Sequence, residues 1–176
     1  MKKNMLLVCF SILLIYILSA CGNVKTNDAP NEEGINEQAA RELGKEFIDK
    51  LYTVEEANLD LENIEAMLEY QNDFSIYLTD DEFEELASKR FFLIPQEAAE
   101  KQQCTISVHN IEIKISNVGK ESVDFDHQFI LEFTEEKGNE VNTIEMNGQM
   151  TVSKTDDGLK ISRYYDSEFP VEMLNP

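Results

Sequence analysis

Apolar residues recur every three or four positions in the first half of the chain, which is the spacing of one face of a helix. One such stripe predicts a helix from about residue 37 to residue 51, capped by Asn36. A second stripe predicts a helix over about residues 60–70. The two stripes consist of Ala40, Leu43, Phe47 and Leu51, and of Leu61, Ile64, Met67 and Leu68. We expect both stripes to face the core of one domain.

A third helix is predicted to begin at the sequence Thr79-Asp80-Asp81-Glu82. This sequence is a capping box, in which the Thr79 hydroxyl and the Glu82 carboxylate each accept from a backbone N–H that lacks a helical partner. The inner side of this helix is predicted to carry Phe83, Leu86, Ala87 and Arg90. Pro95 then suits the first turn of one more short helical segment, which ends near residue 100.

Strand-like alternation begins after Gln103 and continues to the end of the predicted domain. From Val123 to Phe133 the odd-numbered residues are apolar, apart from His127, and most of their neighbours are polar. This strand therefore has one buried and one mostly solvated face. Further strands are predicted at residues 104–115, 144–152 and 159–165. The connections at 117–120, 136–140 and 155–158 each contain a glycine and are short enough for hairpins.

The first strand changes phase at His109 and Asn110. Its apolar residues occupy even positions up to Val108 and odd positions from Ile111 onward. One extra residue in the strand, a β-bulge, produces such a change. With a bulge there, His109 faces solvent; without it, His109 lies on the same face as His127. Alignment of the apolar faces across residues 117–120 places Ile111 opposite His127.

Three helices followed by a bulged four-stranded antiparallel meander predict an α+β fold, with the helices packed on one face of a curved sheet. Over residues 37–168 this order is similar to the NTF2-like, cystatin-like cone fold. The resemblance rests on the helix end FIDKLY (47–52), the helix start YLTDDEF (77–83) and the hairpin GLKI (158–161). That family closes its sheet with a tryptophan, which this chain lacks. Its members include enzymes, ligand binders and structural partners, so the resemblance leaves the function open.

The N-terminus carries a different pattern. Lys2 and Lys3 precede a largely apolar run from Met5 to Leu18, which is 14 residues long. A helix that crosses a bilayer needs roughly 20 residues, so the run predicts a signal peptide. Its end, Leu-Ser-Ala-Cys at 18–21, resembles the lipobox of bacterial lipoproteins, which implies cleavage before Cys21 and acylation of the Cys21 thiol. The alternatives are an ordinary signal peptide cut near residue 20 and an uncleaved anchor.

The predicted organisation is therefore a signal peptide at 1–20, the lipidated Cys21 with a tether at 21–36, and one NTF2-like domain at 37–176. The tether is polar and contains Pro30 and Gly34, which is typical of a flexible coil. A lipid on Cys21 would hold the domain on the extracytoplasmic side of the cell membrane.

The acidic composition restricts the possible partners. The net charge of −20 becomes −22 once residues 1–20, with two lysines and no acid, are removed. Such a chain lacks the cationic surface that nucleic acid binding requires, and anionic lipid repels it, so the lipid on Cys21 has to supply the membrane attachment. Residues 32–100 carry a net charge of −15 and residues 101–176 one of −7. A basic partner protein is therefore expected to prefer the helical half.

No metal or cofactor is predicted. The sequence contains no GxSxG, Walker, Rossmann, HExxH or CxxC motif. Two histidines are half of a zinc site, and no further ligand follows at a suitable spacing. The acidic run at 80–85 lacks the glycine and the alternation of a calcium loop and is interpreted as a helix cap. Cys104 is the only cysteine of the predicted domain, so no internal disulfide forms, and its alternation predicts burial.

His127 is the residue best placed for chemistry, because alternation puts it on the buried face between Phe125 and Phe129. A structural role is expected, and the alternative is a general base inside the cone. Phe125, Phe129 and Tyr165 are further candidates to line a ligand site with His127. Tyr165 is expected to pack with Ile161, or to point outward if the sheet closes over.

The resulting hypothesis is a non-enzymatic, membrane-anchored binding or interaction module. Its partner would be another protein or a second copy through an uncovered apolar sheet face. One alternative is an assembly component of a cell-envelope machine, because NTF2-like domains recur in conjugation and secretion channels. Another is a small enzyme that uses His127.

Overall fold

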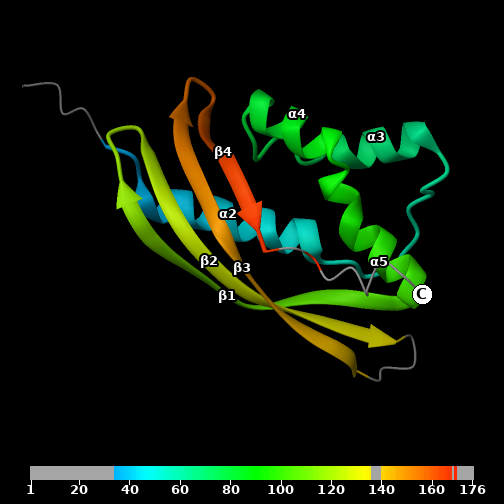
Figure 1. Ribbon diagram of the computed structural model, residues 1–176. Coiled ribbons are helices and arrows are strands. Elements are labelled where there is room, and N and C mark those ends of the chain that lie inside the picture. The colour runs from blue at the N-terminus through cyan, green and yellow to red at the C-terminus, as the bar shows by residue number, and fades with distance from the viewer. Residues whose placement is uncertain (1–33, 136–139, 168, 170–176) are drawn as a thin grey trace, which may run out of the picture. The chain divides into compact units, whose positions relative to one another are not determined.

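The computed structural model describes residues 34–135, 140–167 and 169, so the signal peptide, Cys21 and most of the predicted tether lie outside the described residues. The helices are α2 (Glu37–Tyr52), α3 (Ile64–Asn72), α4 (Asp80–Ser88), η1 (Phe91–Leu93) and α5 (Ile94–Gln102). The strands are β1 (Cys104–Val118), β2 (Ser122–Glu135), β3 (Glu140–Thr155) and β4 (Gly158–Asp166). They form an antiparallel sheet in the order β1-β2-β3-β4 (Figure 1). The predicted α+β meander is confirmed. Within the described part of the chain, none of the helices has the length and apolar character needed to span a bilayer.

Helix α2 packs against all four strands, and we call the face of the sheet that it covers the inner face (Figure 1). Asn36 caps the helix as predicted, because its side-chain oxygen accepts from the backbone N–H of Ala39 at 3.0 Å. From the predicted stripe, Phe47 and Leu51 are fully buried. The ring of Phe47 meets that of Tyr164 edge-on at 4.8 Å, so α2 is joined to β4 through aromatic contacts.

The prediction that one apolar stripe of α3 faces the core is wrong in part. Met67 is buried, but the side chains of Ile64 and Leu68 are exposed by 69% and 61%. The reason is the position of the helix, which packs against η1 and not against the inner face of the sheet. Two of the four apolar residues therefore point to solvent. Asn63 caps the helix, which begins later than predicted.

Only one of the two hydrogen bonds of the capping box forms at the start of α4. The hydroxyl oxygen of Thr79 accepts from the backbone N–H of Glu82 at 3.4 Å. The Glu82 carboxylate does not return to Thr79, whose own N–H donates to the carbonyl of Ile161 at 3.0 Å. It accepts instead from the backbone N–H of Tyr164 at 2.7 Å and is buried. Glu82 thus fastens α4 to β4.

Arg90 lies outside α4, which ends at Ser88, so the prediction of Arg90 on the inner side of that helix is wrong. Its backbone is left-handed, with φ 57, and it turns the chain into η1 and α5. Its side chain is solvent-exposed and pairs with Glu97 at 2.7 Å. Pro95 occupies the first turn of α5, as predicted.

The bulge in β1 is confirmed at Asn110, whose φ is 55. His109 pairs with Ile130 on the outer face, and the next pair is Glu112 with Gln128. Between these two pairs β1 therefore contains one residue more than β2. A second irregularity follows Ile115. Because this second extra residue shifts the register, Ile113 lies opposite His127, and the predicted pairing of Ile111 with His127 is wrong.

A bulge in β4 decides which residues of that strand face inward. Ile161 pairs with Val152, but Arg163 pairs with the preceding residue of β3, so Ser162 is the extra residue. Tyr164 is therefore buried with Ile161, and Tyr165 is 59% exposed on the outer face. The expected packing of Tyr165 with Ile161 is wrong, and the opposite orientation holds.

The outer face of the sheet is polar. On β2 it presents Asp124, Asp126, Gln128 and Glu132, with Ile130 as the apolar exception. The premise of an uncovered apolar sheet face is not met, so a homodimer through this face would have to be held by polar contacts. The other apolar residues of β2 face inward and are buried. Cys104 is buried as predicted, and burial raises the pKa of its thiol.

Candidate functional site

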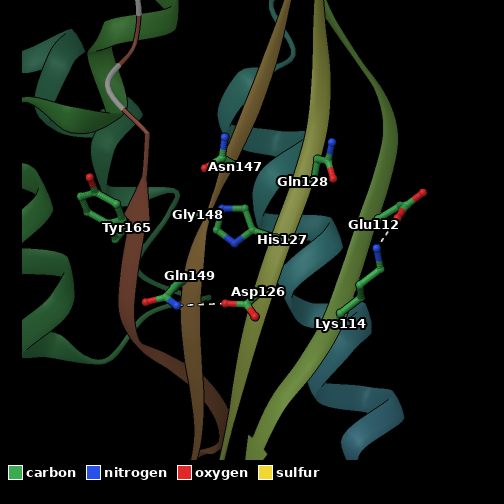
Figure 2. A pocket seen from close by; sticks show the side chains of 9 residues that line it. All are labelled: Glu112, Lys114, Asp126, His127, Gln128, Asn147, Gly148, Gln149 and Tyr165. Atoms are coloured by element: carbon green, nitrogen blue, oxygen red, sulfur yellow. Dashed lines mark hydrogen bonds and ion pairs between the residues drawn. The ribbon is translucent and has the colours of Figure 1, made fainter.

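His127, Gly148 and Asp166 form one row across three strands. In the register of the sheet His127 lies opposite Gly148, which in turn lies opposite Asp166. A Cβ atom on Gly148 would lie 2.6 Å from Nε2 of His127 and 2.0 Å from the carbonyl oxygen of Tyr165. The absence of a side chain at Gly148 therefore lets the imidazole lie across β3 and reach β4. Figure 2 shows the ring of His127 at this point between β2 and β3.

The imidazole makes a short contact with the carboxylate of Asp166. His127 Nε2 lies 2.5 Å from Asp166 Oδ1, and the hydroxyl of Tyr52 donates to Asp166 Oδ2, also at 2.5 Å. Asp166 therefore receives one hydrogen bond from β2 and one from α2. A proton on Nε2 lets His127 act as the donor, which leaves a lone pair on Nδ1. No partner for Nδ1 is found among the described residues.

Aromatic rings enclose this row. Tyr164 stacks on the imidazole with centroids 5.2 Å apart and an angle of 8°, and Phe129 lies on β2 at 5.9 Å. Burial raises the pKa of Tyr52 and of Tyr164 well above the ordinary value, and the charge of Asp166 raises both further. Both phenols therefore keep their protons at neutral pH, and Tyr52 remains a hydrogen-bond donor.

The row is closed to solvent. The side chains of His127 and Asp166 are 0% and 2% exposed. A carboxylate that orients an imidazole is the arrangement of a general base, but a general base must also come within hydrogen-bond distance of its substrate. In this conformation the pair instead joins α2, β2 and β4 through a buried polar network.

An open depression of about 500 Å³ lies on the opposite, outer face of the sheet. Figure 2 shows its polar rim: Gln149 donates to Asp126 at 2.9 Å, and Lys114 pairs with Glu112 at 2.9 Å. Tyr165 lines the depression from β4, and His127 contributes to its floor without an exposed side chain. The side chain of Tyr165 and the imidazole of His127 therefore lie on opposite faces of the sheet and do not line the same site.

The remaining predicted site residues lie apart. Phe125 and Phe129 are fully buried core residues, so their role as ligand-lining residues remains a prediction. His109 faces solvent on the outer side of β1, as the bulge predicts, and lies 3.0 Å from the Ser107 hydroxyl. Within the described ranges, no group of three or more histidine, cysteine or acidic residues is arranged to hold a metal ion.

Neither Tyr52 nor Asp166 is recognisable from the sequence pattern as a partner of His127. One signal for the row is present in the sequence, because Gly148 interrupts the alternation of the third strand at Ile144, Met146 and Met150. A glycine inside a strand often marks the close approach of another group. The position of Asp166 depends on the bulge at Ser162, which the sequence pattern does not show.

Comparisons with known proteins place the fold but not the family. No protein-family model matches the chain, and no curated protein matches it significantly in sequence. A periplasmic fragment of TraM superimposes with a TM-score of 0.52 at 9% identity, covering 76% of this chain and 98% of that one. An IcmL-like type IV secretion system protein from Legionella pneumophila gives a TM-score of 0.54 at 10% identity, covering 78% and 96%. The chain shares the fold of these two proteins.

Proposed function

We propose that this chain is a non-enzymatic interaction module of the bacterial cell envelope, held on the extracytoplasmic side of the membrane by a lipid on Cys21. Its finer role would be that of an assembly component in a multiprotein secretion or conjugation machine. The observation that carries the proposal is the burial of His127 and Asp166, the pair of described residues best suited to acid–base chemistry, whose side chains are only 0% and 2% exposed and so offer almost no surface to a substrate.

The architecture of the row supports a structural role. His127 and Asp166 connect β2 with β4, and Tyr52 adds α2, so exposing the imidazole would require these elements to separate. A buried charged group that loses its partners is strongly destabilising, which opposes such an opening. The alternative of an enzyme that uses His127 would need a second conformation in which the ring becomes exposed.

The fold and the surface support an assembly role. One protein with this fold is a periplasmic fragment of TraM, and another is described as a type IV secretion system protein. The outer sheet face and the helical half both present charged, solvated surfaces, which suit association guided by charge. The lipobox-like sequence before Cys21 would supply the membrane attachment.

The test uses the full-length tagged chain in its native cell. After mild solubilisation of the membrane, we expect the wild-type protein to migrate on a native gel in a complex far larger than a single chain, whose 176 residues have a mass of 20.2 kDa before any cleavage. Migration as a free monomer would contradict the assembly role.

His127→Gln distinguishes the module from the enzyme. We expect this variant to cost about 1–3 kcal/mol of stability, because it disturbs a buried hydrogen-bonded group, yet to enter the same complex at a permissive temperature. If the folded, membrane-bound variant enters the complex but reproduces the phenotype of a gene deletion, the enzyme becomes the better interpretation.

A further inference from the structure

A groove of about 730 Å³ lies between α3 and α4, and the residues that line it do not include His127, Asp166 or Tyr52. Leu68 contributes apolar surface from α3, and Phe83 and Ala87 contribute it from α4. Ile64 extends the apolar surface of the groove along α3, because it lies one helical turn before Leu68 on the same face of the helix. In Figure 1 these two helices lie on the side of the molecule away from β1.

The apolar residues at this groove are unusual for their exposure. Ile64 and Leu68 are among the few large hydrophobic side chains that the described part of the chain leaves largely in water. Two such residues at i and i+4 on one helix form an apolar strip, which is the pattern that a second helix can bury. The core of the domain does not use this strip, because α3 packs through Met67 and Gln71.

The surroundings of the groove are acidic. Glu65 and Glu69 line it directly, and both are exposed. From Glu62 to Ser88 the sequence contains nine acidic residues and no lysine, arginine or histidine. The next basic residue, Lys89, pairs with Glu85 at 2.6 Å. A partner that covers the apolar strip therefore meets a negative rim.

An unsatisfied acceptor lies at the wall of the groove. Gln71 is 8% exposed, its Nε2 donates to the carbonyl of Met67 at 3.3 Å, and its Oε1 has no partner among the described residues. Buried acceptors without partners are rare in folded proteins.

We propose that the α3–α4 groove docks an amphipathic helix of a partner protein, with an apolar face on Leu68 and Ile64 and with lysine or arginine residues against Glu65 and Glu69. The proposal rests on the proposed function, since it names the surface through which the interaction module would engage its partner. A second copy of this chain fits poorly, because its net charge of −20 repels the same rim. Its own residues 22–36 fit poorly too, because their acids outnumber their single lysine.

The binding test uses the full-length chain in nanodiscs of zwitterionic phosphatidylcholine, which do not attract a basic peptide. The probe is a helical peptide with leucines at i, i+3, i+4 and i+7 and with lysines on both flanks of that stripe. A matched peptide carries glutamates in place of the lysines. We expect the lysine peptide to bind at least about tenfold more tightly, with an affinity that falls as salt screens the rim.

Variants locate the binding. The double variant Ile64→Ser and Leu68→Ser should weaken the lysine peptide by about tenfold or more, because it removes the apolar strip. Val118→Ser, which removes a hydrophobic residue that is 50% exposed at the end of β1, should leave the affinity unchanged. Equal binding of the two peptides, or unchanged binding by the double variant, would overturn the proposal. Concentration-dependent dimers abolished by the double variant would assign the groove to a second copy instead.

The native complex separates this inference from the proposed function. We expect a photo-crosslinking residue at position 68, but not one at position 118, to join the chain to a partner segment rich in lysine or arginine. If the wild-type chain forms a large native complex that the Ile64→Ser, Leu68→Ser variant also forms, the groove proposal fails and the module stands. If the peptide binds but no complex exists in the cell, the proposed function fails.

Discussion

Gly148→Ala should disrupt the row of His127 and Asp166 without changing either of these two residues. The added methyl group would lie 2.6 Å from Nε2 of His127, 2.0 Å from the carbonyl of Tyr165 and 2.9 Å from the Cα atom of Asp166. Two of these three atoms belong to the backbone of β4, so rotation of a side chain cannot relieve the contacts. The β4 backbone therefore has to move away from β3, and the imidazole has to shift as well.

The expected cost follows from three contributions. Loss of the hydrogen bond between His127 and the Asp166 carboxylate costs about 1.5–3 kcal/mol, the range for a charged partner. Overpacking of a tight site adds about 1–3 kcal/mol. The lower backbone entropy of alanine in the unfolded chain returns about 0.5–1 kcal/mol. The net destabilisation is about 3 kcal/mol, a large part of the roughly 5–15 kcal/mol that stabilises a domain.

The assay is urea unfolding of residues 34–176, followed by far-ultraviolet circular dichroism. Gly119→Ala is the control, because its methyl group would lie 3.1 Å from the rotatable Ser122 hydroxyl and 3.3 Å from the Ser122 carbonyl oxygen, which are much longer distances than those at Gly148, and its φ is not left-handed. We expect the control to cost less than about 1 kcal/mol. A cost below about 1 kcal/mol for Gly148→Ala, with the ¹⁵N spectrum of His127 unchanged, would refute the argument that the ring crosses β3 at this glycine.

Three further predictions test other parts of the chain. Tyr52→Phe should cost about 1.5–3 kcal/mol in the same unfolding assay, because it removes a donor to the Asp166 carboxylate, whereas Tyr165→Phe, on the solvated face, should cost less than about 0.5 kcal/mol. Burial raises the pKa of Glu82, so this group stabilises the fold most at low pH, and its contribution is lost as the pH rises through the raised pKa. Glu82→Gln keeps an acceptor for the Tyr164 N–H without the buried charge. The stability of this variant relative to the wild type should therefore improve as the pH rises from about 4 to about 7. A stability difference between variant and wild type that does not change with pH would contradict this. Cys21→Ser should abolish labelling by a fatty-acid analogue and release the protein from the membrane or leave its precursor uncleaved, and continued labelling would remove the lipoprotein interpretation.

Where a local sequence pattern is compatible with only one arrangement of a helix or strand, the sequence alone predicted the structure. The stripe of α2 and its Asn36 cap, the alternation that buries His127, and the phase change that requires a bulge near Asn110 are all confirmed. Each follows from the period of a helix or a strand, because a change of phase would expose several apolar side chains at once.

The tertiary structure decided the features for which the local pattern allowed two solutions. Tyr164 and Tyr165 are adjacent aromatic residues, so either can face inward, and the bulge at Ser162 turns Tyr164 and Asp166 toward His127. The apolar stripe of α3 does not determine which neighbouring element covers it, and the packing of the helix on η1 leaves Leu68 exposed to solvent. Glu82 fits a capping box as well as a contact with β4. In each case a contact between residues distant in sequence selects one of two solutions of similar local energy, so the sequence pattern defines the elements and nonlocal packing decides which side chains meet.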